Sequence, residues 1–190
     1  MKVTKEQNAA HHRAIIGAAS RLFRERGFDD VSVIDIMKGA GLTHGAFYGH
    51  FSSKAELAAE ACRLAFEESL AEWTDDTSLS RSLDLYLSVA HRDKAGSGCP
   101  MASFVSKVGN QDKIVKKQFS SGVSNYVEKV AGQLIAGGIK KPQARKQAVA
   151  IVSTMIGGMA LARSLSATDR QLSSELLAGS RAAIRSQFGV

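Results

Sequence analysis

Apolar residues recur three or four positions apart along most of this chain, which is the spacing that places them on one face of an α-helix. No stretch shows the strict alternation of apolar and polar residues that a half-buried strand requires. Only two prolines, Pro100 and Pro142, interrupt the pattern. The sequence therefore predicts an all-α fold of about nine helices, the longer and later of which cover residues 54–73, 79–90, 115–135, 143–165 and 169–187.

Short polar or glycine-containing segments separate these helices. Residues 74–78, Thr-Asp-Asp-Thr-Ser, end one helix and cap the next, and Thr168-Asp169 caps the last. Residues 95–98 contain two glycines and break the pattern, after which Cys99-Pro100-Met101 begins a further helix with proline in its first turn. The helix over residues 54–73 is expected to connect an N-terminal unit to a larger C-terminal one.

Two short helical patterns flank a Gly-Ala-Gly-Leu turn at residues 39–42. The first begins at Ser32, where the side chains of Ser32 and Asp35 are placed to satisfy the free amides of a helix start. The second covers residues 43–51, and its two phenylalanines lie four positions apart on an inward face. This arrangement is typical of a helix-turn-helix, whose second helix enters the major groove of DNA.

The side chains left facing outward have the chemistry that a DNA surface requires. The Thr43 hydroxyl can cap the second helix or meet a phosphate, and the Ala46 methyl can press on a thymine methyl group. Histidine, tyrosine and lysine side chains donate to bases or phosphates. Each residue alone is an ordinary surface residue, so the prediction depends on the spacing of the whole set. The candidate DNA-contacting residues are Ser32, Thr43, His44, Ala46, Tyr48, His50 and Lys54.

Residues 41–57, Gly-Leu-Thr-His-Gly-Ala-Phe-Tyr-Gly-His-Phe-Ser-Ser-Lys-Ala-Glu-Leu, resemble the DNA-binding signature of the TetR family of bacterial transcriptional regulators. Residues 18–28 look like the first helix of that family and its end. The resemblance implies a DNA-binding domain over residues 1–55 and a helical ligand-sensing and dimerisation domain over 56–190. Gly49 departs from the pattern, because a larger side chain usually stands there. Glycine costs a helix roughly 1 kcal/mol.

The resemblance also implies a function. A regulator of this kind binds a palindromic operator as a homodimer and releases it when a small molecule engages the second domain. Repression is the commoner outcome, and activation is the alternative. The residues specify neither the operator, the controlled genes nor the effector.

Two C-terminal helices carry more apolar surface than a short solvated helix needs. Gly157-Gly158 in the first would let another backbone approach closely. Two such helices from each of two chains form a four-helix, two-fold interface that suits a palindromic site. Burial of the same residues inside one monomer is the alternative. The residues concerned are Ala148, Ile151, Val152, Met155, Ile156, Met159 and Ala160 in the first helix, and Leu172, Leu176, Leu177, Ala183 and Ile184 in the second.

Aromatic and methionine side chains on several C-terminal helices are candidates for lining an effector cavity, although core packing is the better explanation of each residue taken alone. They are Phe66, Trp73, Tyr86, Phe104, Phe119, Tyr126, Met155 and Met159. Cys99 is a candidate redox or electrophile sensor, because a helix start favours the thiolate. The Gly98-Cys99 element resembles one in some TetR-like regulators that respond to electrophiles or oxidants. The alternative is that Cys99 is a small buried apolar residue.

Charge, cysteine spacing and hydropathy narrow the possible partners, cofactors and location of the protein. The net charge of +7 favours a polyanionic partner, yet residues 1–55 hold eight basic and five acidic residues, so charge alone does not establish DNA binding. Cys62 and Cys99 lack metal-ligand spacing, and neither a metal nor a cofactor is expected. The N-terminus lacks the apolar run of a signal peptide, and the longest uncharged stretch, residues 148–162, is shorter than the ~20 residues of a membrane helix. We therefore expect a cytoplasmic protein without a membrane partner.

Three rival functions remain. An enzyme would need a convergent acid, base or nucleophile, and the sequence contains no Gly-x-Ser-x-Gly, His-Glu-x-x-His, P-loop or Cys-x-x-Cys motif. A non-specific or architectural nucleic-acid-binding protein would bind any duplex with similar affinity. A helical adaptor that has lost DNA binding is the third alternative, and Gly49 is the only residue that favours it.

Overall fold

The computed structural model describes residues 4–74 and 77–190, and these residues form helices and no strands. The all-α prediction is thereby confirmed. The described residues contain nine α-helices and two short 3₁₀ helices. They are α1 Lys5–Arg26, α2 Val33–Gly39, η1 His44–Gly49, α3 Lys54–Ala71, α4 Leu79–Tyr86, α5 Val89–Asp93, α6 Pro100–Phe104, η2 Val108–Asn110, α7 Lys113–Ala136, α8 Lys141–Leu165 and α9 Arg170–Phe188.

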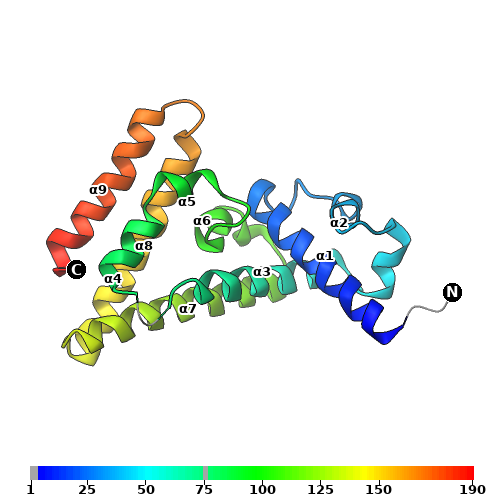
Figure 1. Ribbon diagram of the computed structural model, residues 1–190, viewed down its shortest axis with the longest axis horizontal. Coiled ribbons are helices and arrows are strands. Elements are labelled where there is room, and N and C mark those ends of the chain that lie inside the picture. Colours follow the sequence, from blue (N-terminus) through cyan, green and yellow to red (C-terminus); the bar gives the residue numbers. More distant parts are fainter. Residues whose placement is uncertain (1–3, 75–76) are drawn as a thin grey trace.

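An N-terminal unit forms around α1, which packs against α2 and α3 (Figure 1). The helix-turn-helix begins as the sequence predicts, because Ser32 and Asp35 form a reciprocal capping box at the start of α2. Gly41 has a φ of 72°, a conformation that glycine adopts without strain, and it makes the turn after α2. Phe47 and Phe51 are each 2% exposed and hold η1 on the core.

In the C-terminal unit α3 packs on α7, α7 on α8, and α8 on α9 (Figure 1). α3 and α7 run in the same direction, since Phe66 meets Phe119 and Trp73 meets Gln133, whereas the chain reverses direction between α8 and α9. α3 also packs on α1, so one continuous helix of 18 residues belongs to both units. The expected division between residues 55 and 56 falls inside this helix. Movement of one end of α3 must therefore displace residues at the other.

The N-terminal unit, made of α1, α2, η1 and the start of α3, is called the reader below. The second helix of its helix-turn-helix differs from the expectation of an α-helix over residues 43–51. The chain forms the 3₁₀ helix His44–Gly49, and the Thr43 side chain makes no capping hydrogen bond, although Thr43 occupies the cap position. Two of the six residues, Gly45 and Gly49, have the low helix propensity that limits a regular α-helix.

Three other boundaries also differ. The pattern over residues 79–90 is divided into α4 and α5, because Ser88 caps a new helix by accepting from the His91 amide at 3.1 Å. The helix at Pro100 contains only five residues. Of the cap expected at 74–78, Asp75 and Asp76 lie outside the described residues, and Ser78 caps α4.

The length of α8 also differs from the sequence analysis, which found no stretch as long as a membrane helix. This helix, Lys141–Leu165, is long and apolar enough to cross a membrane by length and composition, a test that core helices of soluble proteins also pass. Its apolar residues Ile151, Val152 and Met155 are at most 2% exposed and pack inside the molecule.

Close packing of α3 on α7 depends on Gly122. A Cβ atom at this position would overlap the ring of Phe66, which is 3% exposed and has no room to move. We predict that Gly122→Ala destabilises the protein, because overpacking costs roughly 1–3 kcal/mol and offsets the gain of about 1 kcal/mol in helix propensity. Urea denaturation gives the free energy of unfolding.

The matched control is Gly132→Ala on the same helix, where a Cβ meets no atom within 4 Å. This variant should be as stable as the wild type or up to about 1 kcal/mol more stable. Equal effects of the two substitutions would contradict the packing argument.

Candidate nucleic-acid interface and cavity

The 3₁₀ helix η1 presents one aromatic side chain to solvent beside two that are buried. Phe47 and Phe51 stack with ring centroids 5.8 Å apart and anchor the segment. Tyr48 follows Phe47 directly and is 70% exposed, the largest exposed fraction among the large apolar and aromatic side chains described. The surface thus combines a fixed backbone with a projecting phenol ring, which suits contact with a phosphate or a base edge.

The other candidate contact residues surround Tyr48. Thr43 and His44 are exposed, and the His44 ring meets the Tyr48 ring edge-on at 6.0 Å. Ala46, His50 and Lys54 are half-buried, and Ala46 packs partly on the core. Ser32 is exposed, but its hydroxyl donates to the Asp35 carboxylate at 2.6 Å. The structure therefore places the set around one short segment, with Ser32 at the start of the preceding helix.

The beginning of α3 already has an internal anion. The Glu56 carboxylate accepts from the Ser52 amide at 2.8 Å and from the Ser52 hydroxyl at 2.6 Å. These hydrogen bonds lower the pKa of Glu56. A DNA phosphate at this helix start would compete with Glu56 for the Ser52 donors. The Lys54 side chain is therefore a better candidate for a phosphate contact than the Ser52 amide or hydroxyl.

A cluster of histidines adjoins the segment and was not found by sequence reasoning. The His50 ring lies 6.3 Å from the His11 ring and 5.9 Å from the His12 ring. His12 stacks on Phe51 at 4.7 Å and lies 3.3 Å from the Glu60 carboxylate. Burial, with the nearby His12 and His11, lowers the pKa of His50 and favours its neutral form. The only sequence signal is that four of five histidines lie in the first 50 residues.

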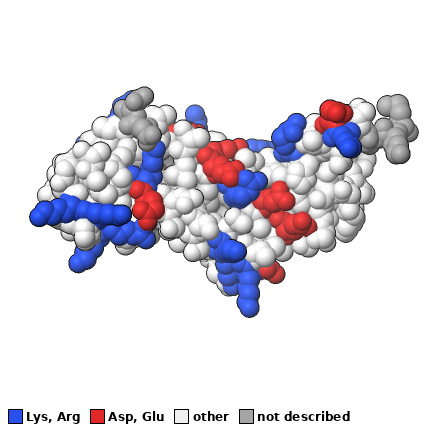
Figure 2. Space-filling view, turned by 90° about the horizontal axis from the view of Figure 1, so that it is seen from below, with Lys and Arg blue, Asp and Glu red and all other residues white. Residues whose placement is uncertain are grey.

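Surface charge is not gathered into one stripe on the face that Figure 2 shows. Basic and acidic side chains alternate there with wide uncharged areas. This agrees with the modest charge surplus of residues 1–55. On this face, charge alone therefore marks no nucleic-acid-binding surface.

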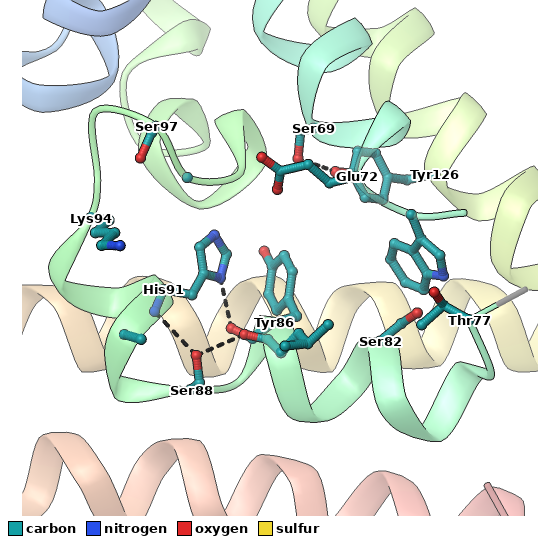
Figure 3. Close-up of a pocket in the computed structure, with 14 residues that line it drawn as sticks. Ser69, Glu72, Thr77, Ser82, Tyr86, Ser88, His91, Lys94, Ser97 and Tyr126 are labelled. Carbon is teal, nitrogen blue, oxygen red and sulfur yellow. Dashed lines mark hydrogen bonds between the residues drawn. The ribbon is translucent and has the colours of Figure 1, made fainter. Parts of the chain in front are cut away.

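A cavity of about 400 Å³ lies in the C-terminal unit, between the ends of α3, α4, α5 and α7 (Figure 3). Trp73, Tyr86 and Tyr126 line it, as three of the eight candidate residues. The other five do not line it. Phe66, Phe104, Met155 and Met159 are buried in the core, and Phe119 is half-buried.

Polar groups make most of the remaining wall, and sequence reasoning did not identify them. The His91 ring makes two hydrogen bonds, from its Nδ1 to the Tyr86 carbonyl at 2.7 Å and from the Cys99 amide to its Nε2 at 2.9 Å. Burial is the main reason that the pKa of His91 falls to about 4, so the ring is neutral at pH 7. The hydroxyl groups of Ser82 and Tyr86 are buried and make no hydrogen bond.

Cys99 is 2% exposed and lies beside the cavity rather than on its wall. Ser97 and Gly98, which precede it, do line the cavity. Burial is the main cause of the raised pKa of the Tyr86 and Tyr126 hydroxyls, and the adjacent Cys99 thiol contributes to it. Cys62 is fully buried and its pKa is raised to about 12 by burial, which keeps it an unreactive thiol.

Comparison with known proteins agrees with this architecture. The model of the bacterial regulatory proteins of the tetR family matches residues 15–61, and that of the LmrA/YxaF-like transcriptional regulator C-terminal domain matches residues 77–171. The transcriptional regulator TtgR of Pseudomonas putida is 46% identical over 54 residues, which are 28% of this chain and 26% of TtgR. The match thus spans about a quarter of that relative.

Longer matches are more distant. An uncharacterised HTH-type transcriptional regulator of Mycobacterium tuberculosis is 27% identical over 180 residues, covering 86% of this chain and 93% of its own length. The crystal structure of a TetR transcriptional regulator from Chloroflexus aurantiacus superposes with a TM-score of 0.77 at 21% identity, over 97% of this chain and 96% of the other.

The two family models together account for the reader and for most of the helices behind it. The relatives are transcriptional regulators, which are not enzymes. This chain belongs to the TetR family of bacterial regulatory proteins.

Proposed function

We propose that this protein is a ligand-responsive repressor that binds a palindromic operator as a homodimer in the cytoplasm. The observation that carries the proposal is the projection of Tyr48 from a segment anchored by buried Phe47. Exposure of an aromatic ring to water is unfavourable in the isolated protein, and contact with a duplex would bury the ring. Thr43, His44 and Lys54 beside it supply hydrogen-bond donors for phosphates and base edges.

A homodimer is supported by apolar residues that the monomer leaves exposed. Most of the residues from which the sequence predicted this interface are instead buried within the monomer, including Ile151, Met155 and Ile184. Other apolar side chains of the two helices remain exposed, with Val149 46% and Leu161 54% exposed on α8. Leu172, which belongs to the predicted set, is 42% exposed on α9. Gly157 lies on the same face of α8 as Leu161, with no atom within 4 Å of a Cβ there.

The cavity is the proposed effector site, and α3 is the proposed connection to the reader. Ser69, Glu72 and Trp73 line the cavity at or just beyond the C-terminal end of α3. Lys54 begins the same helix about 27 Å away at 1.5 Å per residue. An effector that favours a displaced α3 by about 1–3 kcal/mol would weaken operator binding by roughly 5- to 150-fold.

Cys99 is the proposed sensor of electrophiles in this scheme. Its burial means that a reagent reaches the thiol only by way of the cavity or after local opening. The Cys99 amide already donates a hydrogen bond to the His91 ring, and α6 has only five residues. The start of this helix therefore stabilises a thiolate only weakly. Proximity to the cavity is therefore the main support for this role.

We predict that Lys54→Gln weakens operator binding and lowers the salt dependence by about one counterion, because one phosphate contact is lost.

Tyr48→Ala should weaken binding by roughly 1–3 kcal/mol. The operator is obtained by selecting bound fragments from genomic DNA, and affinity is measured by fluorescence anisotropy. The control Lys116→Gln removes one exposed charge from α7 and should bind normally. A wild-type protein that binds random duplex as tightly as any selected fragment would establish the architectural alternative instead.

The dimer has a separate test. We predict that Leu161→Lys lowers the mass in solution from dimer to monomer, because two lysines would face each other across the two-fold axis. Light scattering at micromolar concentration measures the mass. Leu85→Lys changes an equally exposed leucine on α4, 52% exposed, and should remain dimeric. A monomeric wild type would contradict the proposal.

For the sensor role, we predict that iodoacetamide weakens operator binding by the wild-type protein and not by Cys99→Ser. The thiolate sulfur displaces iodide from the reagent and leaves an acetamide group next to Tyr86. Cys62→Ser is the matched control and should respond as the wild type does. An unchanged dose response in Cys99→Ser, with an unaltered circular dichroism spectrum, would show that Cys99 is only a buried packing residue.

A further inference from the structure

A second cavity, of about 720 Å³, lies where the end of α1 meets α5, α6 and the turn between α8 and α9. It therefore borders both the N-terminal reader and the C-terminal unit. Five basic side chains line it, against two carboxylates. The basic residues are Arg24, Arg92, Lys107, Arg163 and Arg170, and the acidic ones are Glu25 and Asp93.

The two carboxylates of this cavity already have partners. Asp93 lies 2.7 Å from Arg92 and 3.3 Å from Arg170, and Glu25 lies 3.4 Å from Arg21. Arg24 pairs with Glu68 at 3.1 Å, outside the cavity wall. Among the residues that the structure describes, Lys107 and Arg163 have no carboxylate within ion-pair distance. The cavity thus has two cations whose charge is not compensated.

Arg163 is the more unusual of the two because its guanidinium is largely buried. Its Nη1 donates to Ser103 at 2.9 Å and its Nη2 to the His91 carbonyl at 3.2 Å, while its buried Nε has no partner. The pKa of Arg163 is lowered mainly by burial, and the nearby positive charge of Arg24 lowers it further. A buried charge without a counterion is costly, so the arrangement favours any anion that can enter.

We propose that this cavity binds a small oxyanion, either a phosphate group or a carboxylate, between Arg24, Lys107 and Arg163. Guanidinium groups present parallel N–H donors that match two oxygens of such an anion, and the lysine adds a point charge. Arg24 uses three of its five N–H donors, on the Ser20 carbonyl, the Gly98 carbonyl and the Glu68 carboxylate, so two remain for an anion. Lys107 Nζ donates to the Arg26 carbonyl at 2.7 Å, which leaves two of its three donors.

The site differs from both sites described above. Arg24 lies 12 residues beyond His12 along α1, or about 18 Å from the histidine cluster at the reader. The backbone of Gly98 separates the anion site from the effector cavity, because Arg24 Nη1 donates to the Gly98 carbonyl at 3.3 Å. A Cβ at Gly98 would collide with His91, which lines the effector cavity, and with Arg163, which lines the anion site.

An anion here would join the two units of the protein. Arg24 belongs to α1 of the reader, and Arg163 belongs to α8 of the C-terminal unit. Their like charges repel across the junction, and an anion between them is attracted to both, which makes the sum of the three interactions favourable. Anion binding therefore favours the arrangement in which α1 is docked against α5, α6 and α8.

Isothermal titration of the full chain with inorganic phosphate, at ionic strength held constant with sodium chloride, tests the proposal. A parallel titration with citrate distinguishes phosphate from carboxylate as the preferred group. We expect saturable binding by the wild type, weakened about tenfold or more in Arg163→Gln because charge-assisted hydrogen bonds are lost. Lys107→Gln, which removes a less buried cation, should weaken binding without disturbing the fold.

The matched control is Lys146→Gln, which removes one charge from the opposite end of the same helix α8 and should bind the anion as the wild type does. Tyr48→Ala should also bind it normally, so this result is independent of operator recognition. Absence of saturable heat with both anions, or equal affinity in wild type, Arg163→Gln and Lys107→Gln, would overturn the proposal.

Discussion

The rest of the structure depends on the packing of α3 against two different partners. The first half of its buried face, with Leu57, Ala58 and Ala61, meets α1. The second half, with Ala65 and Phe66, meets α7. Alanine at three of these five positions allows close approach of the neighbouring helices, which is costly to loosen because interiors are packed near crystal density. The two units therefore share one continuous helix rather than a flexible linker, and in the proposed function a displacement at the cavity is transmitted to η1 through it.

Polar packing makes a second connection between the units. Arg24 is 7% exposed and donates to the Ser20 carbonyl of its own helix, to the Gly98 carbonyl of the loop before α6 and to the Glu68 carboxylate of α3. Buried hydrogen-bonded charges are costly to separate, because each partner left behind stays unsatisfied. These hydrogen bonds hold the junction in the arrangement that the structure shows. A protein that responds to a ligand needs such defined arrangements.

The features that the sequence predicted correctly depend on residues close together in the chain. They are the helices, which follow from the spacing of apolar residues, and the DNA-binding motif of residues 41–57. Helix periodicity gave the long helices to within a few residues, and the Ser32–Asp35 spacing gave a capping box that the structure contains. It did not predict contacts between distant segments: His12 beside His50, Arg24 beside Gly98, or the cavity residue His91. Nor could periodicity tell which apolar residues of α8 face the core and which, such as Leu161, face outward, because both sets share one spacing of 3.6 residues.

The local form of the reader explains why a modest effector energy can suffice. A 3₁₀ helix of six residues with two glycines has poorer hydrogen-bond geometry and greater backbone entropy to lose than an α-helix. Its position is set mainly by Phe47 and Phe51 in the core shared with α1 and α3. Since η1 contributes little stability of its own, its geometry follows that of α3. A displacement of α3 favoured by about 1–3 kcal/mol is then enough to change operator affinity in the proposed mechanism.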